Sequence, residues 1–446
     1  MNLAKVINLK YLPILILVFL TLFFRLYQIE NRYIFDWDQE DDAIKVTEMI
    51  QNLKPRLIGP RVANESGFFV GPFHYYFLLP FFLLFKYSPY SGAYAAIFVS
   101  LVTVIVTYLI LSKIFNSKIA FISSFTLATS ASLISWNVMY TPLLSTLIFY
   151  FCYLLLKGKK EIFPYLVFLY SFSATTHLVP AVLILPIIVS VILSKYRPSS
   201  KQTILSIVLF IIPFLPLIAF DLKHNFINIL SIKSFIFSSK SASENVPFLF
   251  LRTFWRSINP VFLSNSVAII VSRIIILIIS IIEIIKIKNI KFRFFVLIWF
   301  LAPLLVLSLY HGNIPEYYYG TSLILFPIFM ATFINRISSK YFRYPVLALI
   351  FIFQFSYFRS PATGIYLKNK LSLARYLVSQ TQDNNFNLSY DLPIGFNSGY
   401  GYLFKYLGEV PQDIPEAHLY SVFLNSNPPK SGQIVYADNV IGLVRK

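Results

Sequence analysis

Carboxylates and cysteine are scarce in this 446-residue sequence. It holds 19 Asp plus Glu against 38 Lys plus Arg, a formal net charge of +19, and charged residues make up only 13% of the chain. The single cysteine, Cys152, lies inside an apolar run, which argues against disulfides, zinc sites and thiol catalysis. The basic residues form short clusters between apolar stretches, so they do not indicate a nucleic-acid-binding surface.

Apolar residues are abundant instead. Hydrophobic residues make up 57% of the chain and aromatic residues 18%, with a mean hydropathy of +0.69. These values exceed ordinary globular usage and indicate a multi-spanning membrane protein, not a soluble enzyme. Residues 11–24 have the length of a signal-peptide core, but no small-residue cleavage site follows them, so we expect a retained first helix.

Twelve apolar segments are candidates for membrane helices, which predicts an all-α polytopic membrane protein. They are residues 11–28, 73–86, 92–112, 119–135, 141–156, 162–176, 179–194, 203–219, 262–285, 294–310, 319–335 and 344–358. Basic clusters lie between them: Lys5/Lys10, Lys113/Lys118, Lys157/Lys159/Lys160, Lys195/Arg197/Lys201, Lys286/Lys288/Lys291/Arg293 and Arg336/Lys340/Arg343. Such clusters favour the cytoplasmic side of a membrane.

All six clusters share one side only if one early segment does not cross. Residues 73–86 are the shortest segment and contain Pro80, so we expect an interfacial or re-entrant helix there. About eleven transmembrane helices then remain in a domain of residues 1–358. This arrangement predicts a plasma (inner) membrane protein with a cytoplasmic N-terminus, an outer first loop over residues 29–91 and an outer C-terminus.

After residue 358 the composition becomes mixed and polar. A helical pattern at 371–379, strand-like runs at 387–390 and 418–424, and a hairpin pattern at 434–436 and 440–444 across Asp438-Asn439 follow in order. Residues 359–446 are therefore predicted to form a small soluble α/β domain outside the membrane.

The predicted first outer loop is rich in carboxylates. Eight of the 19 carboxylates come before residue 66, and five of them lie between Asp36 and Asp42. Carboxylates beside a low-dielectric layer are costly to desolvate, which makes this loop a candidate site.

Two interpretations of the acidic run compete. Apolar residues recur at helical spacing after Asp38, which predicts an amphipathic interfacial helix over 39–53 with Asp38 as its N-cap and Asp41 completing the cap. Alternatively, one carboxylate acts as a general base on an incoming hydroxyl group, a role for which we name Asp38, with Asp36 and Glu40 in reserve.

A base of this kind needs partners for a charged leaving group. Cationic and phenolic side chains on the predicted outer side could bind a phosphate. They are Arg56, Arg61, His74, His177, Lys223, His224, Arg252, Arg256, His311, Tyr317, Tyr318 and Tyr319. We select Arg61, His74, His177, Lys223, His224 and Tyr318 as binders of a donor phosphate or substrate. For each one taken singly, contact with lipid headgroups or a place in the interfacial aromatic belt is the plainer explanation.

The stretch from Tyr27 to about Leu156 resembles the C-class glycosyltransferases, which take a sugar from a polyprenyl-phosphate carrier and include protein O-mannosyltransferases and lipid A aminoarabinose transferases. Several motifs carry the resemblance: Asp38-Gln39, Glu48-Met49 ten residues after the Asp, Gly59-Pro60, Gly71-Pro72 with the following His74-Tyr75-Tyr76, a Ser112-Lys113-Ile114-Phe115 turn, and Trp136-Asn137 before Pro142. The family carries Asp-Glu-Ala where this chain has Asp38-Gln39-Glu40.

The resemblance implies that Asp38 deprotonates the acceptor, with inversion at the sugar carbon, and that the interfacial helices match 39–53 and 73–86. Two departures from the family pattern matter: Gln39 replaces the usual Glu, and no His-Pro-Pro is present. Phosphate binding therefore cannot be assigned to the residue that the family usually uses, and Arg61 or His74 is a possible substitute. No cofactor is firmly implied. Asp36 or Glu40 could hold a divalent cation, although solvated carboxylates explain them equally well, and we assign no metal ligand.

The predicted activity is transfer of a hexosyl or pentosyl group from a polyprenyl-phosphate sugar to a lipid, glycan or protein acceptor in the cell envelope. A transporter or flippase of lipid-linked sugars is the main alternative; it predicts ionisable residues near the bilayer midplane and often an internal repeat, neither of which is evident. A glycan polymerase or ligase would share the outer-face chemistry and differ in its acceptor.

Overall fold

The structure is a computed structural model. It describes residues 11–62, 67–129, 135–237, 266–307, 316–322, 324–359, 364–381, 385–393, 395–412, 414 and 417–446. Arg252, Arg256 and His311, which the sequence suggested as phosphate ligands, lie outside these residues.

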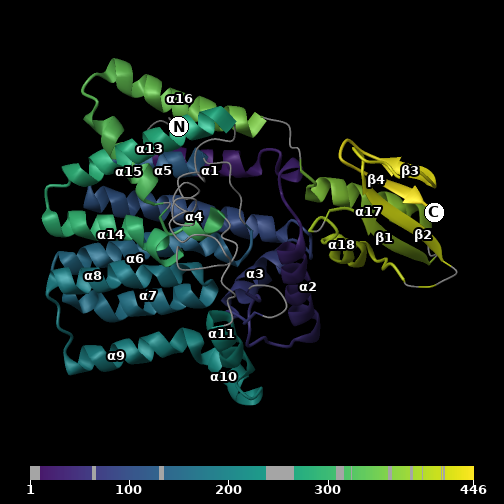
Figure 1. The fold of residues 1–446 in the computed structure, drawn as a ribbon, viewed down its shortest axis with the longest axis horizontal. Coiled ribbons are helices and arrows are strands. Elements are labelled where there is room, and N and C mark those ends of the chain that lie inside the picture. The colour runs from purple at the N-terminus through teal and green to yellow at the C-terminus, as the bar shows by residue number, and fades with distance from the viewer. Residues whose placement is uncertain are drawn as a thin grey trace, which may run out of the picture.

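Most of the chain forms a bundle in which the axes of the long helices are roughly aligned (Figure 1). In chain order the α-helices of this part are α1 (Leu12–Leu26), α2 (Trp37–Asn52), α3 (Phe73–Leu84), α4 (Ser91–Ile114), α5 (Ser117–Thr129), α6 (Thr141–Leu156), α7 (Phe163–Thr176), α8 (Ile184–Ser194), α9 (Ser200–Ile211), α10 (Leu215–Lys223), α11 (Ile227–Phe237), α13 (Ser266–Lys286), α14 (Ile290–Leu307), α15 (Leu325–Arg336) and α16 (Lys340–Arg359). Short 3-10 turns join several of them, such as η5 (Asn137–Tyr140), η7 (Val179–Leu183) and η9 (Glu316–Tyr319).

The helices follow the apolar segments of the sequence and the predicted amphipathic helix over 39–53, with one addition. Among the described residues, four helical stretches are long and apolar enough to cross a membrane: Ser91–Ile114, Asn137–Leu156, Ser200–Lys223 and Ile290–Leu307. Several of the other predicted crossings are shorter apolar helices, so the number of eleven and the orientation of the termini stay predictions. Helix α11 lies in a region, predicted to be an outer loop, for which no helix was predicted.

The C-terminal residues form two helices and a four-stranded sheet. The helices are α17 (Leu367–Thr381) and α18 (Tyr400–Leu407), and the strands are β1 (Phe386–Asp391), β2 (His418–Leu424), β3 (Gln433–Ala437) and β4 (Ile441–Arg445). The strand order is β1-β2-β4-β3, with β1 and β2 parallel and the other pairs antiparallel. The predicted hairpin is confirmed, because β3 and β4 pair antiparallel. In the turn between them, Asp438 accepts hydrogen bonds from the backbone N–H groups of Val440 and Ile441 at 2.7 and 2.8 Å.

This C-terminal region packs against the end of the bundle that carries α2 and α3 (Figure 1). One hydrophobic core joins the two parts. It includes Tyr33, Phe35 and Val46 from the first loop and Leu371, Leu403 and Val422 from the C-terminal region. The burial of these side chains favours close association of the acidic loop and the last 80 or so residues, roughly in proportion to the apolar area removed from water.

Candidate active site

Helix α2 begins at the acidic run, and its N-cap is Asp36. The prediction that Asp38 is the N-cap was wrong. Gln39 occupies the third helical position, and its side-chain oxygen accepts the backbone N–H of Asp36 at 3.0 Å, as in a capping box. Asp36 and Gln39 thus cap the start of the helix. Asp38 lies in the first turn, and its side chain takes no part in the cap.

Four of the five acids in the run have partners. Asp36 forms an ion pair with the buried Lys370, and Asp41 contacts Lys45 one turn later at 2.5 Å. Asp42 contacts His74 of α3 at 2.8 Å. Glu40 accepts the backbone N–H groups of Gly399 and Tyr402 at 2.6 and 3.0 Å, at the start of α18.

Asp38 is the exception. Within the described part of the chain, its carboxylate makes no hydrogen bond and no ion pair. It reaches solvent, although protein surrounds much of it. Burial, together with the charges of Asp42 and Asp41, raises the pKa of Asp38 to about 6. An accessible and unpartnered carboxylate with a pKa near neutrality has the properties of a general base.

Lys370 was not found from the sequence. Its side chain is fully buried, and besides the ion pair it donates hydrogen bonds to the backbone oxygens of Phe35 at 2.9 Å and Ser398 at 2.8 Å. The ring of Tyr400 lies 5.4 Å from its nitrogen. A signal was present, since Lys370 falls on the apolar stripe of α17 formed by Leu367, Leu371 and Ala374.

A second buried polar chain lies behind Asp38. His74 bridges two side chains: its Nε2 is 2.8 Å from Asp42 and its Nδ1 is 3.0 Å from the hydroxyl of Tyr140. His74 has no exposed surface. It therefore joins α2 to α3 and to the turn η5, and it does not present its ring to solvent as a phosphate ligand would.

Three of the predicted phosphate binders come from two loops that contact each other. Arg61 lies beside Phe69, with its guanidinium 5.7 Å from that ring. Phe69 donates its backbone N–H to the side chain of Asn228 at 2.7 Å. This contact brings the first loop to the start of α11, next to the end of α10, where Lys223 and His224 are exposed. His224 stacks on Phe220, with 4.1 Å between ring centroids.

His177 and Tyr318 form part of an aromatic cluster beside the turn η5 and the end of α7. Their rings lie 6.0 Å apart, and Tyr317 contacts both His177 and Trp136. Burial lowers the pKa of His177 to about 4. His177 is therefore neutral at pH 7 and accepts the backbone N–H of Val179 at 3.1 Å. Arg56 is also engaged, 2.8 Å from Glu48.

The first loop makes unusually close backbone contacts at Gly59 and Gly71. A side-chain carbon at Gly59 would lie 2.0 Å from the backbone oxygen of Gly71. Gly71 in turn donates its backbone N–H to Thr175 at the end of α7, at 2.7 Å. The glycines of the Gly59-Pro60 and Gly71-Pro72 motifs thus allow the loop to fold flat against α7.

We expect Gly59→Ala to lower the stability of the protein by about 1–3 kcal/mol, because the new methyl group overlaps backbone that cannot move independently. Thermal unfolding of the purified protein in detergent measures this as a lower midpoint. An unchanged midpoint would contradict the close approach.

The residues described here hold no group of three or more His, Cys, Asp or Glu side chains placed to bind a metal ion. Asp36 and Glu40, the acids considered for a divalent cation, instead contact Lys370 and the start of α18. A cation at this loop would have to compete with those contacts.

No protein-family model and no curated protein sequence matches the chain. Solved structures do match. ArnT from Cupriavidus metallidurans bound to undecaprenyl phosphate aligns with a TM-score of 0.63 at 11% identity, over 97% of each chain, and its apo state aligns with a TM-score of 0.64 at 11% identity, over 98% of each chain. The Archaeoglobus fulgidus oligosaccharyltransferase in the apo form aligns with a TM-score of 0.50 at 11% identity, over 93% of this chain and 70% of that one. The chain therefore shares the fold of these membrane transferases.

Proposed function

We propose that this chain, which has the fold of the C-class membrane glycosyltransferases, transfers a sugar from a polyprenyl-phosphate donor to a hydroxyl group of an acceptor. The fold supports the class of enzyme. The one observation that carries the chemistry is Asp38, the member of the acidic run whose carboxylate has no partner in the described structure.

The proposed reaction is a direct displacement at the anomeric carbon. The acceptor oxygen forms a bond to that carbon while the bond from the carbon to the phosphate oxygen breaks, and the electron pair of that bond leaves with the polyprenyl phosphate. Asp38 takes the proton of the acceptor hydroxyl. A single displacement inverts the configuration at the sugar carbon, and because phosphate is a competent leaving group, the protein mainly supplies positioning and charge stabilisation.

The other acids are poor candidates for the base. Asp36 and Glu40 were reserves in the sequence analysis, but one holds Lys370 and the other holds two backbone N–H groups. A proton on either carboxylate would weaken these contacts. Their proposed role is to fix the start of α2, which orients Asp38 two residues from the N-cap.

The donor phosphate requires positive charge that remains accessible. Arg61, Lys223 and His224 are exposed on two loops joined through Phe69 and Asn228, and they are the residues that we assign to this role. His74 is withdrawn into its contacts with Asp42 and Tyr140, so we assign it to positioning. The hydroxyl of Tyr318, beside His177, is assigned to substrate contact.

One structural neighbour also supports a polyprenyl-phosphate donor, because ArnT was solved bound to undecaprenyl phosphate. We propose the same class of carrier here, with a lipid, glycan or protein hydroxyl as acceptor. A transporter of lipid-linked sugars would move the donor without breaking the sugar-phosphate bond. Release of polyprenyl phosphate by the purified protein in lipid nanodiscs, in the presence of acceptor, therefore separates the two functions.

The pH dependence of this release provides the test of the base. Asp38 accepts a proton only when it is ionised, and its pKa is raised to about 6. As the pH increases toward this value, we expect kcat/KM to rise about tenfold per pH unit; above this value kcat/KM should be constant. A profile that stays flat between about pH 4.5 and 8 would exclude a base with this pKa.

A further inference from the structure

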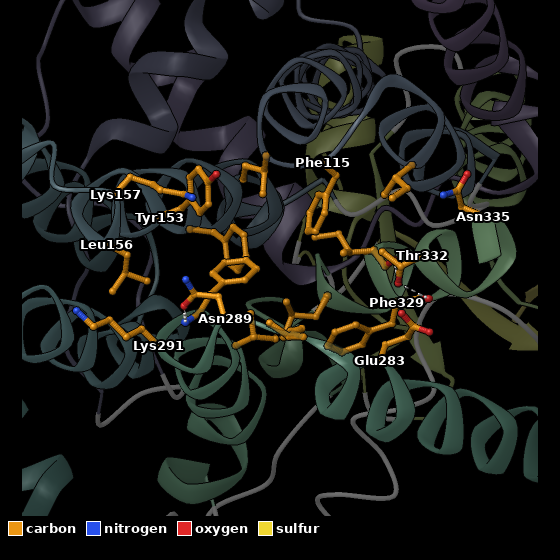
Figure 2. Close-up of a pocket in the computed structure, with 18 of the residues that line it drawn as sticks. Phe115, Tyr153, Leu156, Lys157, Glu283, Asn289, Lys291, Phe329, Thr332 and Asn335 are labelled. Atoms are coloured by element: carbon orange, nitrogen blue, oxygen red, sulfur yellow. Dashed lines mark hydrogen bonds between the residues drawn. The ribbon is translucent and has the colours of Figure 1, made fainter.

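Figure 2 shows a cavity of about 410 Å³. It lies at the ends of α4 and α6, whereas the starts of these two helices lie near α3 and η5, at the end of the bundle that carries α2. Its walls come from the end of α4, the end of α6, the turn between α13 and α14, and the end of α15. Four of the basic clusters found in the sequence lie at these helix ends. The volume falls within the range of about 300–1,000 Å³ that is typical of small-molecule sites.

The cavity has two polar ends and an apolar middle. Figure 2 shows Lys157 and Lys291 at one end, and Glu283, Thr332 and Asn335 at the other. Aromatic rings line the space between them: Phe115, Phe149, Tyr153, Phe292 and Phe329. The lysine end and the rings beside it suit a ligand that combines a negatively charged group with an apolar chain.

The charges at the two ends differ. Glu283 is 3% exposed and contacts Arg336 at 3.1 Å, so this end is close to neutral. No carboxylate pairs with Lys157 or Lys291 in the described part of the chain, and both are exposed. Lys157 lies over the ring of Tyr153, with its nitrogen 5.6 Å from the ring centroid. The lysine end therefore carries two uncompensated positive charges.

We propose that this cavity binds one anionic phospholipid of the surrounding bilayer. The headgroup phosphate would lie between Lys157 and Lys291, and an acyl chain would lie along the aromatic walls of the middle part. Lysines at the ends of membrane helices attract anionic headgroups. The two unpaired charges favour a lipid with net negative charge over a zwitterionic one, and the site lies at the opposite end of the bundle from Asp38.

Native mass spectrometry of the full chain tests this proposal. The protein is released from nanodiscs that contain equal amounts of phosphatidylglycerol and phosphatidylcholine, and the lipids that remain bound are counted. We expect one phosphatidylglycerol molecule to be retained. The double variant Lys157→Gln/Lys291→Gln should lose its preference for phosphatidylglycerol by roughly tenfold or more.

A matched control comes from the same two loops. Lys159 and Lys288 are exposed lysines that do not line the cavity, so Lys159→Gln/Lys288→Gln removes the same charge and should retain the lipid. Equal loss in both double variants would indicate diffuse attraction to the basic face and overturn the site.

A third variant tests the cavity without changing charge. Thr332→Phe places a ring inside it and should displace the lipid, provided that the purified variant elutes as the wild type does on size exclusion. Full retention by this folded variant would place the lipid elsewhere and overturn the proposal. Because binding is measured directly, the result does not depend on the proposed transferase activity.

Discussion

Replacement of Asp38 by asparagine is expected to slow sugar transfer by about 10²–10⁴-fold, the usual contribution of a general base. The amide has nearly the same shape but cannot take the proton of the acceptor hydroxyl at neutral pH. The residues assigned to the donor phosphate, Arg61, Lys223 and His224, are unchanged, so the variant should still bind the polyprenyl-phosphate donor. Transfer rates and donor retention, measured on the same nanodisc preparation, separate the two effects.

Stability provides an internal control for this variant. The pKa of Asp38 is raised in the folded protein, so the folded state binds the proton more tightly than the unfolded state. The stability that this group contributes is present at low pH and is lost as the pH rises through about 6. At about pH 7.5, Asp38→Asn should therefore unfold at the same temperature as the wild type or at a higher one.

The neighbouring Asp41→Asn offers a matched comparison. Asp41 makes an i,i+4 pair with Lys45 at the partly exposed surface of α2, an interaction worth about 0.3–0.5 kcal/mol. We expect its transfer rate to stay within about threefold of the wild type. Full activity in Asp38→Asn, or an equal loss in both variants, would remove Asp38 from the mechanism.

The second large effect is expected at Lys370. Lys370→Met removes the partner of Asp36 and leaves the backbone oxygens of Phe35 and Ser398 without their donor. Removal of one member of a buried ion pair costs about 3–5 kcal/mol; Asp36 keeps 28% of its side chain exposed, which favours the lower end of that range. The thermal unfolding midpoint should fall clearly, and the C-terminal region should become more sensitive to protease.

Lys370→Met should also reduce sugar transfer, because Asp36, two residues before Asp38, loses the ion pair that holds the start of α2 in place. Lys368→Met removes an exposed lysine from the same helix and should change neither stability nor activity. If the two variants behave alike, the ion pair does not hold the C-terminal region in place. A double-mutant cycle with Asp36→Asn measures the coupling between the two side chains directly.

Local features of the fold could be predicted from the sequence. The hairpin of β3 and β4 follows from alternating apolar residues around Asp438-Asn439, because turn residues and strand periodicity act over a few positions. The amphipathic helix after the acidic run was also predicted. Its start was misplaced by two residues, because Asp36 and Asp38 are equally good caps and only Gln39, which bonds back to Asp36, decides between them.

The partners of the acids could not be predicted in the same way. Asp36 meets Lys370 and Glu40 meets Gly399 across more than 300 residues of chain, and no local pattern specifies such pairs. The sequence nevertheless narrowed the choice to Asp38 through the spacing of Glu48-Met49 and the family resemblance. What it could not supply was the physical contrast between one unpartnered carboxylate and four engaged ones.

The contact between Lys370 and Phe35 joins residues 335 positions apart, which has a consequence for how the protein is made. At a synthesis rate of about 5–20 residues per second, roughly 20–70 seconds pass between the synthesis of Phe35 and that of Lys370. During this interval Asp36 and Glu40 lack the partners that they have in the folded protein. The contacts at the start of α2 are thus completed only after Lys370 has been synthesised, so we expect the proposed activity to depend on synthesis of the chain well beyond the helical bundle.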